Sequence, residues 1–166
     1  MNRLTASIRL LTGLFLAATV ARAESPAEFD ARLEAAVQDE GVTIVHLWAT
    51  WCHNCWREHD NDGWKNFIAA NPDVKVIFVS VWGSREDDHA ELSRYDIVDL
   101  PNLEIWRHPN QSRRDNERMV SLLGQEVTWI PTTWVYRKGT LRYAINYGEV
   151  RFPMLQAMVD DTTASW

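Results

Sequence analysis

The sequence is poor in cysteine, glycine and proline. Its 166 residues include two cysteines, seven glycines and six prolines. Two cysteines cannot build a disulfide-rich scaffold or a zinc site of four thiolates, and so few glycines and prolines exclude collagen and low-complexity sequence. Hydrophobic residues make up 46% of the chain, which argues against global disorder. The length and composition predict one compact domain with a substantial core.

Positive charge is also scarce. The chain has 17 Lys and Arg residues against 23 Asp and Glu residues, which gives a formal net charge of -6. A protein that neutralises the phosphates of DNA or RNA carries clustered basic side chains. We therefore expect no nucleic-acid partner.

The first 23 residues have the pattern of a secretory signal peptide. A basic start is followed by an apolar run of 11 residues at 10–20 and by the cleavage pattern A-x-A at 21–23. A membrane-spanning helix needs about 20 apolar residues, so we favour cleavage over a signal anchor at the inner membrane that faces the periplasm. Cleavage removes three arginines and no acid, which leaves 143 residues with a net charge of -9. We expect a periplasmic protein without stable membrane insertion.

Helix and strand patterns alternate along residues 24–166. Strands are predicted at 42–48, 74–82, 127–136 and 141–147. Helices are predicted at 25–37, 52–70, 84–95, 112–123 and 152–160. Ser25 and Ser84 are the expected caps of the first and third helices, and the second helix is expected to break at 61–63. Segment 96–111 stays unassigned. Arg113, Arg114 and Arg118 are interpreted as a polar helix face, with a local basic patch as the alternative. This order predicts a single α/β domain.

The two cysteines lie together where the apolar strand 42–48 leads into a helix. Cys52 and Cys55 are separated by His53 and Asn54. The unpaired N–H groups and the dipole at a helix N-terminus favour an anion, so we expect the Cys52 thiol to ionise well below its free pKa of about 8.5. Cys52 is then the attacking thiolate, and Cys55, one turn later, is the resolving thiol. In an oxidising compartment the pair is expected to form a disulfide.

Two segments resemble the thioredoxin superfamily, in particular its exported TlpA/ResA/CcmG(DsbE)-like branch of thiol-disulfide oxidoreductases. They read VHLWATWCHNCWRE at Val45–Glu58 and VTWIPTTWV at Val127–Val135. The resemblance covers most of the exported chain by element order, but not 96–125. It implies an α/β thioredoxin-like fold with a central mixed β-sheet flanked by helices, and an enzyme that needs no cofactor. Such an enzyme would reduce specific protein disulfides through a mixed disulfide on Cys52 and would take electrons from a membrane thiol-disulfide donor.

The resemblance also suggests a substrate-binding edge. In the family, the proline that matches Pro131 is cis and faces the disulfide, where the neighbouring backbone pairs with the substrate. Ile130 and Pro131 are therefore candidate substrate-binding residues, and a cis bond before proline costs little. The alternative is an ordinary proline at the start of a strand. Trp51 adjoins the cysteine motif, and we expect it to shield the disulfide and contact partners.

Three further residues are candidates for tuning the thiols. Glu58 matches a family glutamate whose implied role is proton management, although a solvated helix glutamate is the alternative. His46 stands where the family usually has Asp or Asn, and it is either a proton relay or a satisfied core histidine. His53 would stabilise the Cys52 thiolate, but oxidants of the superfamily carry histidine at the place of Asn54. The direction of electron flow therefore stays open between a reductase and a periplasmic oxidant or isomerase.

Two other functions are compatible with the cysteine pair. Cys52, Cys55, His53 and His59 are soft and borderline ligands suited to Cu(I) or Zn, although no second cysteine pair exists to complete a site, and we expect no metal. A permanent structural disulfide is the other alternative, but so short a loop removes little entropy from the unfolded chain. Covalent haem attachment is excluded because Trp56 occupies the position that C-x-x-C-H gives to histidine.

Overall fold

The computed structural model describes residues 22–83, 87–146 and 148–164. The predicted signal peptide lies outside the described residues except for its last two positions, and so does the predicted helix cap Ser84. Within the described part of the chain, no helix combines the length and the apolar character needed to cross a bilayer.

Helices and strands alternate as the patterns predict. The helices are α1 (Pro26–Ala36), α2 (His53–His59), α3 (Gly63–Ala70), α4 (Asp88–Ser93) and α5 (Phe152–Thr163), with the short 3-10 turn η1 (Asp60–Asp62) between α2 and α3. The strands are β1 (Val42–Trp48), β2 (Lys75–Ser80), β3 (Leu103–Arg107), β4 (Ser121–Leu122), β5 (Gln125–Glu126), β6 (Thr132–Arg137) and β7 (Thr140–Ile145).

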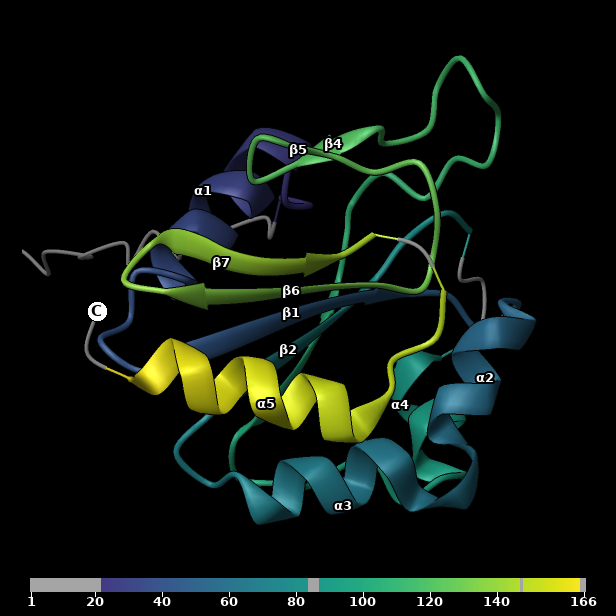
Figure 1. Ribbon diagram of the computed structural model, residues 1–166. Coiled ribbons are helices and arrows are strands. Elements are labelled where there is room, and N and C mark those ends of the chain that lie inside the picture. Colours follow the sequence, from purple (N-terminus) through teal and green to yellow (C-terminus); the bar gives the residue numbers. More distant parts are fainter. Residues whose placement is uncertain (1–21, 84–86, 147, 165–166) are drawn as a thin grey trace, which may run out of the picture.

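A mixed sheet of five strands forms the centre of the molecule, in the order β3-β2-β1-β6-β7. Strands β1, β2 and β3 run parallel, whereas β6 pairs antiparallel with both β1 and β7. Figure 1 shows α3 and α5 side by side on one side of the sheet and α1 on the other. Because helices cover both faces, every residue of β1 is buried, as its continuous apolar pattern predicts. The expected α/β class and flanked mixed sheet are confirmed.

Aromatic side chains fill the layer between the sheet and α3. Trp64 is completely buried, and its ring meets Phe78 of β2 edge-on at 5.0 Å and Phe152 of α5 edge-on at 5.4 Å between ring centroids. Such contacts add to the large apolar area that aromatic residues bury. They hold α3 and α5 against β2, which pairs with the strand that leads to the cysteines.

The predicted helix 112–123 is wrong. Residues 112–118 are almost all polar and form turns, since a helix there would have no apolar face to bury. The two-stranded sheet β4-β5 follows, and Leu123 and Gly124 between its strands both have positive φ, at 51° and 71°. Two successive residues with positive φ are what a tight hairpin turn requires. We refer to residues 108–131, between β3 and β6, as the crossover loop.

Other elements also differ from the predicted bounds, most clearly β3, α4 and β6. Strand β3 lies in the segment left unassigned, at the edge of the sheet. Helix α4 is capped by Asp87, whose side chain accepts hydrogen bonds from two backbone N–H groups. Strand β6 begins at Thr132 and not at 127, because Pro131 has no N–H to give to a strand ladder. The break predicted at 61–63 is confirmed by the turn η1.

Gly63 offers a test of how tightly α2, α3 and α5 are packed. A Cβ atom at Gly63 would overlap the Phe152 ring and approach the Glu58 carbonyl oxygen to 2.9 Å, whereas one at Gly41 would have an ordinary contact of 3.6 Å with the Asp73 carbonyl oxygen. We expect Gly63→Ala to lower the free energy of unfolding by about 1–3 kcal/mol through overpacking and Gly41→Ala to change it little. Urea unfolding of the oxidised protein measures both, and equal stability of the two variants would contradict this packing.

Candidate active site

The cysteine pair joins the end of β1 to the start of α2. Cys52 is the N-cap of α2, and its Sγ atom is bonded to that of Cys55 in a disulfide. The backbone N–H of Cys55 points at Cys52 Sγ, at 3.3 Å. This geometry would stabilise negative charge on Cys52 after reduction. Cys52 retains 5% exposure and Cys55 none, so Cys52 is the sulfur nearer to solvent.

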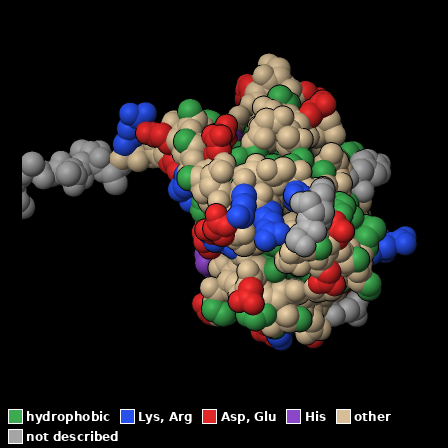
Figure 2. All heavy atoms as spheres, turned by 60° about the vertical axis from the view of Figure 1, so that its left-hand side comes forward, with side chains coloured by type: hydrophobic (Ala, Val, Ile, Leu, Met, Phe, Trp, Pro, Cys, Tyr) green, Lys and Arg blue, Asp and Glu red, His purple; other side chains and the backbone are tan. Residues whose placement is uncertain are grey.

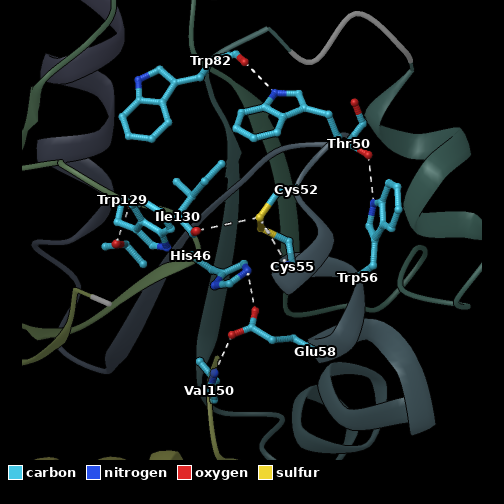
Figure 3. The surroundings of a disulfide bond; sticks show 12 residues. His46, Thr50, Cys52, Cys55, Trp56, Glu58, Trp82, Trp129, Ile130 and Val150 are labelled. Atoms are coloured by element: carbon cyan, nitrogen blue, oxygen red, sulfur yellow. Dashed lines mark hydrogen bonds and ion pairs between the residues drawn. A yellow bond between two sulfur atoms is a disulfide. The ribbon is translucent and has the colours of Figure 1, made fainter. Parts of the chain in front are cut away.

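Ile130 and Pro131 lie beside Cys52, where the sequence placed them. The peptide bond between them is cis, and the Ile130 carbonyl oxygen lies 3.8 Å from Cys52 Sγ. Figure 3 shows this carbonyl pointing at the sulfur from the segment that leads into β6. Two parts of the chain almost 80 residues apart therefore meet at the reactive sulfur.

Tryptophans surround the disulfide on its solvent side. Trp51 is 39% exposed and Trp129 is 44% exposed, and the indole N–H of Trp51 donates to the carbonyl oxygen of Trp82 at 2.7 Å. Their side chains border a groove of about 360 Å³, which we call the Cys52 groove. It is lined by Trp51, Cys52, His53, Asn54, Trp82, Arg118, Thr128, Trp129 and Ile130.

A buried histidine and glutamate lie on the opposite side of the disulfide. His46 of β1 and Glu58 of α2 are buried, and His46 Nε2 lies 3.2 Å from Glu58 Oε2. His46 Nδ1 is 2.9 Å from the Thr133 hydroxyl on β6. The other carboxyl oxygen of Glu58 accepts a hydrogen bond of 2.5 Å from the backbone N–H of Val150. In Figure 3 the His46 ring lies between the disulfide and Glu58.

Burial moves the proton affinities of this pair in opposite directions. Burial raises the pKa of Glu58 to about 8, although the hydrogen bonds from Val150 and Trp64 oppose that change. Burial, aided by repulsion from His59, lowers the pKa of His46 well below 6.5. Both groups are therefore neutral at pH 7, which removes the cost of two buried charges. Release of the Glu58 proton leaves one negative charge in the core, on a carboxylate that the backbone N–H of Val150 and the indole N–H of Trp64 stabilise.

The remaining candidates have different surroundings. His53 is exposed on the first turn of α2, where its ring packs edge-on against Trp56 at 5.9 Å between centroids. His59 is buried between Trp48 and Tyr95, and burial lowers its pKa to about 4. In the described part of the chain, no three His, Cys, Asp or Glu side chains come together as metal ligands would.

The sequence interpretation missed the arginines and two tryptophans at the groove. The guanidinium of Arg113 lies 4.0 Å from the centre of the Trp51 ring, and that of Arg118 lies 5.0 Å from the Trp82 ring. Trp82 is buried and also lines the groove, and Trp129 is exposed at its border. The crossover loop has no apolar periodicity that would indicate its place in the fold. Because 112–123 was assigned to a helix, nothing in the sequence placed Arg113 or Arg118 at the groove.

The shifted pKa values of Glu58, His46 and His59 predict that the free energy of unfolding is largest near pH 6.5. Between pH 4.5 and 8 the folded state keeps a proton on Glu58 that the unfolded chain releases, so stability falls as the pH rises. Below pH 6.5 the unfolded chain protonates His46 and His59 while the folded state resists, so stability falls as the pH falls. Each proton by which the folded and unfolded states differ changes the free energy of unfolding by about 1.4 kcal/mol per pH unit. Below pH 6.5 the two histidines therefore change the stability more than Glu58 does, and in the opposite direction.

Urea unfolding of the oxidised protein between pH 4.5 and 8.5 measures this profile. We expect Glu58→Gln to flatten the decline above pH 6.5, because glutamine keeps the shape of the neutral acid but does not titrate. We expect His59→Phe to reduce the decline on the acid side. An unchanged alkaline slope in Glu58→Gln would show that Glu58 is ionised in the folded protein at neutral pH.

No protein-family model and no curated protein matches the sequence. Solved structures do resemble the chain. A secreted disulfide oxidoreductase of Mycobacterium tuberculosis, described as homologous to E. coli DsbE, has 20% identity over 76% of this chain and 85% of its own, with a TM-score of 0.53. A DsbF homologue from Corynebacterium diphtheriae has 17% identity over 76% of this chain and 74% of its own, with a TM-score of 0.53.

A thiol:disulfide interchange protein of the thioredoxin family from Chlorobium tepidum has 15% identity over 77% of this chain and 83% of its own, with a TM-score of 0.52. At this level of sequence identity, the structural similarity establishes the fold alone. The chain therefore has the thioredoxin-like fold, with a C-x-x-C disulfide at the start of the helix that follows its central strand.

Proposed function

We propose that the protein is an exported thiol-disulfide oxidoreductase that reduces specific protein disulfides. The observation that carries this proposal is the asymmetry of the Cys52–Cys55 disulfide. Cys52 borders an open groove and adjoins the Ile130 carbonyl, whereas Cys55 is completely buried. A substrate sulfur can therefore reach one cysteine, and the second is kept for the intramolecular step.

The reaction follows from this arrangement. In the reduced protein, the Cys52 thiolate attacks one sulfur of a substrate disulfide, and the other substrate sulfur leaves as a thiolate. The Cys55 thiol then loses its proton and attacks Cys52 Sγ, which breaks the mixed disulfide and releases the second substrate thiolate. Two electrons pass from the cysteine pair to the substrate, and the protein ends as the disulfide seen in the structure.

The buried pair His46 and Glu58 handles the proton that Cys55 gives up and regains. A general base works best when its pKa lies near the operating pH, and the pKa of Glu58, about 8, lies close to that of a free thiol, about 8.5. His46 acts as a positioning residue because it holds the carboxyl group between itself and Val150.

Substrate contact is assigned to the residues around Cys52. Trp51 provides an exposed aromatic surface beside the sulfur. Ile130 and Pro131 offer a backbone edge next to it, to which an extended substrate segment would add by strand-like pairing. His53 lines the same groove and would favour the Cys52 thiolate when protonated.

The site of action is part of the proposal. The signal-like pattern at 1–23 supports export to the periplasm, and the similar protein from Mycobacterium tuberculosis is described as secreted. In an oxidising compartment a reductase must be recharged with electrons. We therefore include a membrane thiol-disulfide electron donor as its partner.

A disulfide oxidant with the same site is the alternative function, supported by His53 between the cysteines. The reduction potential of the Cys52–Cys55 pair separates the two directions. A value near thioredoxin's, about -270 mV, supports the reductase, and a value near about -120 mV supports the oxidant. A pair that glutathione buffers cannot reduce would instead be a structural disulfide.

The first activity test uses cysteine variants. Cys55→Ala should accumulate mixed disulfides on Cys52 when mixed with oxidised protein substrates, because the resolving thiol is missing. Cys52→Ala should trap none, since Cys55 is buried. Non-reducing electrophoresis detects the adducts, and reduction of insulin by the parent protein measures turnover. If Cys55→Ala forms no adduct and the parent reduces no insulin, the protein is not a disulfide oxidoreductase.

Glu58→Gln tests the proton pair. We expect the resolving step to slow by on the order of 10²-fold at pH 7 and to lose the rise with pH that follows a group of pKa about 8. Stopped-flow measurement of mixed-disulfide resolution gives both. Glu34→Gln is the matched control, because Glu34 is an exposed carboxylate on α1, away from the cysteine pair. Equal rates in the two variants would remove Glu58 from the mechanism.

A further inference from the structure

Two arginines of the crossover loop lie beside the Cys52 groove. Arg113 and Arg118 share a small cavity of about 110 Å³ with Trp51 and Trp82, and Arg118 also lines the Cys52 groove itself. Each guanidinium lies over an indole ring, Arg113 over Trp51 and Arg118 over Trp82. A stacked guanidinium keeps its N–H groups at its edge, where they remain able to bind a carboxylate.

The positive charge at the Cys52 groove and the adjoining small cavity contrasts with the net negative charge of the chain. The sequence carries six more acidic than basic residues, and Figure 2 shows acidic and basic side chains interspersed on the face that it draws. Among the described residues that line the groove and the small cavity, the charged side chains are Arg113 and Arg118 and no carboxylate is present. Cations without facing acids concentrate an electrostatic field in a concave surface.

Arg118 has an unused hydrogen-bond donor. Its Nε atom is buried and has no hydrogen-bond partner within the described residues. The carboxylate of Asp115 lies 3.7 Å from Nη1, but the Asp115 side chain is 94% exposed, so this pair is weak. A buried donor without a partner is costly. A carboxylate at the groove would bind the accessible part of the guanidinium, because the Arg118 side chain is 33% exposed although Nε is buried.

Contacts of the crossover loop restrict where the two arginines lie, although Arg113 is exposed. The indole N–H of Trp82 donates to the carbonyl oxygen of Met119 at 2.8 Å, which ties the crossover loop to the groove. The stem of Arg113 lies against Gly83, where a Cβ atom would approach Arg113 Cγ and Cδ to 2.8 Å. Preorganised charges lose little entropy when a ligand binds.

We propose that Arg113 and Arg118 form a subsite for an acidic side chain of the substrate polypeptide, next to the cysteine that Cys52 attacks. This inference rests on the proposed function and names its substrate class. The occupant is a polypeptide, because the groove continues from the arginines past Cys52 to the backbone edge at Ile130 and the exposed ring of Trp129. Figure 3 shows Trp82 and Trp129 on the Cys52 side of the disulfide, away from Glu58.

The subsite acts on the first exchange step. The carboxylate binds the arginines while the Cys52 thiolate attacks the neighbouring sulfur of the substrate, and the bond to the other substrate sulfur breaks. No proton or electron passes through the arginines. Their effect is therefore a faster encounter with acidic substrates, and salt weakens this effect because it screens the attraction between the charges.

The test measures single-turnover exchange of the reduced protein with matched peptides. Each peptide carries one cysteine in a mixed disulfide with a chromophoric thiol, and its neighbours are Glu in one peptide and Gln in the other. We expect the Glu peptide to react about tenfold faster at low salt and the difference to shrink at high salt. We expect the double variant Arg113→Gln/Arg118→Gln to bring the ratio of the Glu-peptide rate to the Gln-peptide rate close to one.

Arg114→Gln is the matched control, because Arg114 is an exposed neighbour that pairs with Glu117 at 3.2 Å; it should keep the preference. Equal rates for both peptides, or loss of the preference in Arg114→Gln, would overturn the subsite. Glutathione disulfide, which has carboxylates but no extended segment, should react more slowly than the Glu peptide, and an equal rate would overturn the assignment to a polypeptide. If no peptide reacts with the reduced parent, the proposed function itself fails.

Discussion

The pairing of β1 with β6 determines where the two halves of the site meet. Cys52 follows the end of β1, and Ile130 precedes the start of β6. The antiparallel register places His46 opposite Thr133 and Leu47 opposite Thr132, so the segment before β6 must arrive beside the segment after β1. A shift of one residue would turn every side chain of the strand to the opposite face. The approach of the Ile130 carbonyl to Cys52 is therefore a consequence of sheet register.

The disulfide separates two different environments. On the side of His46 and Glu58 the surroundings are buried, and uncharged forms are favoured. On the side of Trp51 and Arg118 lies an open groove with fixed positive charge. Thiol-disulfide exchange needs both, because a buried thiol must exchange a proton while the other sulfur meets a large substrate. The first turn of α2 supplies one cysteine to each environment.

The parts of the fold predicted from the sequence are those in which local pattern and tertiary packing agree. Strand β1 is apolar and buried, α1 has its capping box at Ser25, and the cysteines occupy the helix start that their position after a buried strand predicts. The positions of Glu58, Ile130 and Pro131 near the disulfide were predicted through a family resemblance. The contact between His46 and Glu58 was not predicted, because it depends on how α2 packs against the sheet and on the backbone of Val150.

The crossover loop could not be predicted from local pattern. Its polar run from 112 to 118 has helix formers but no apolar stripe, and its place is set by contacts to distant residues, such as the bond from Trp82 to Met119. Because the loop contributes no strand to the five-stranded sheet, changes within it leave the register of β1 and β6 untouched. Residues 113–118, which carry the two arginines, are thus separate in sequence from the cysteine motif, whereas the end of the loop at Ile130 lies beside Cys52. Residues 113–118 could therefore change while the cysteine pair and the cis bond between Ile130 and Pro131 stay the same.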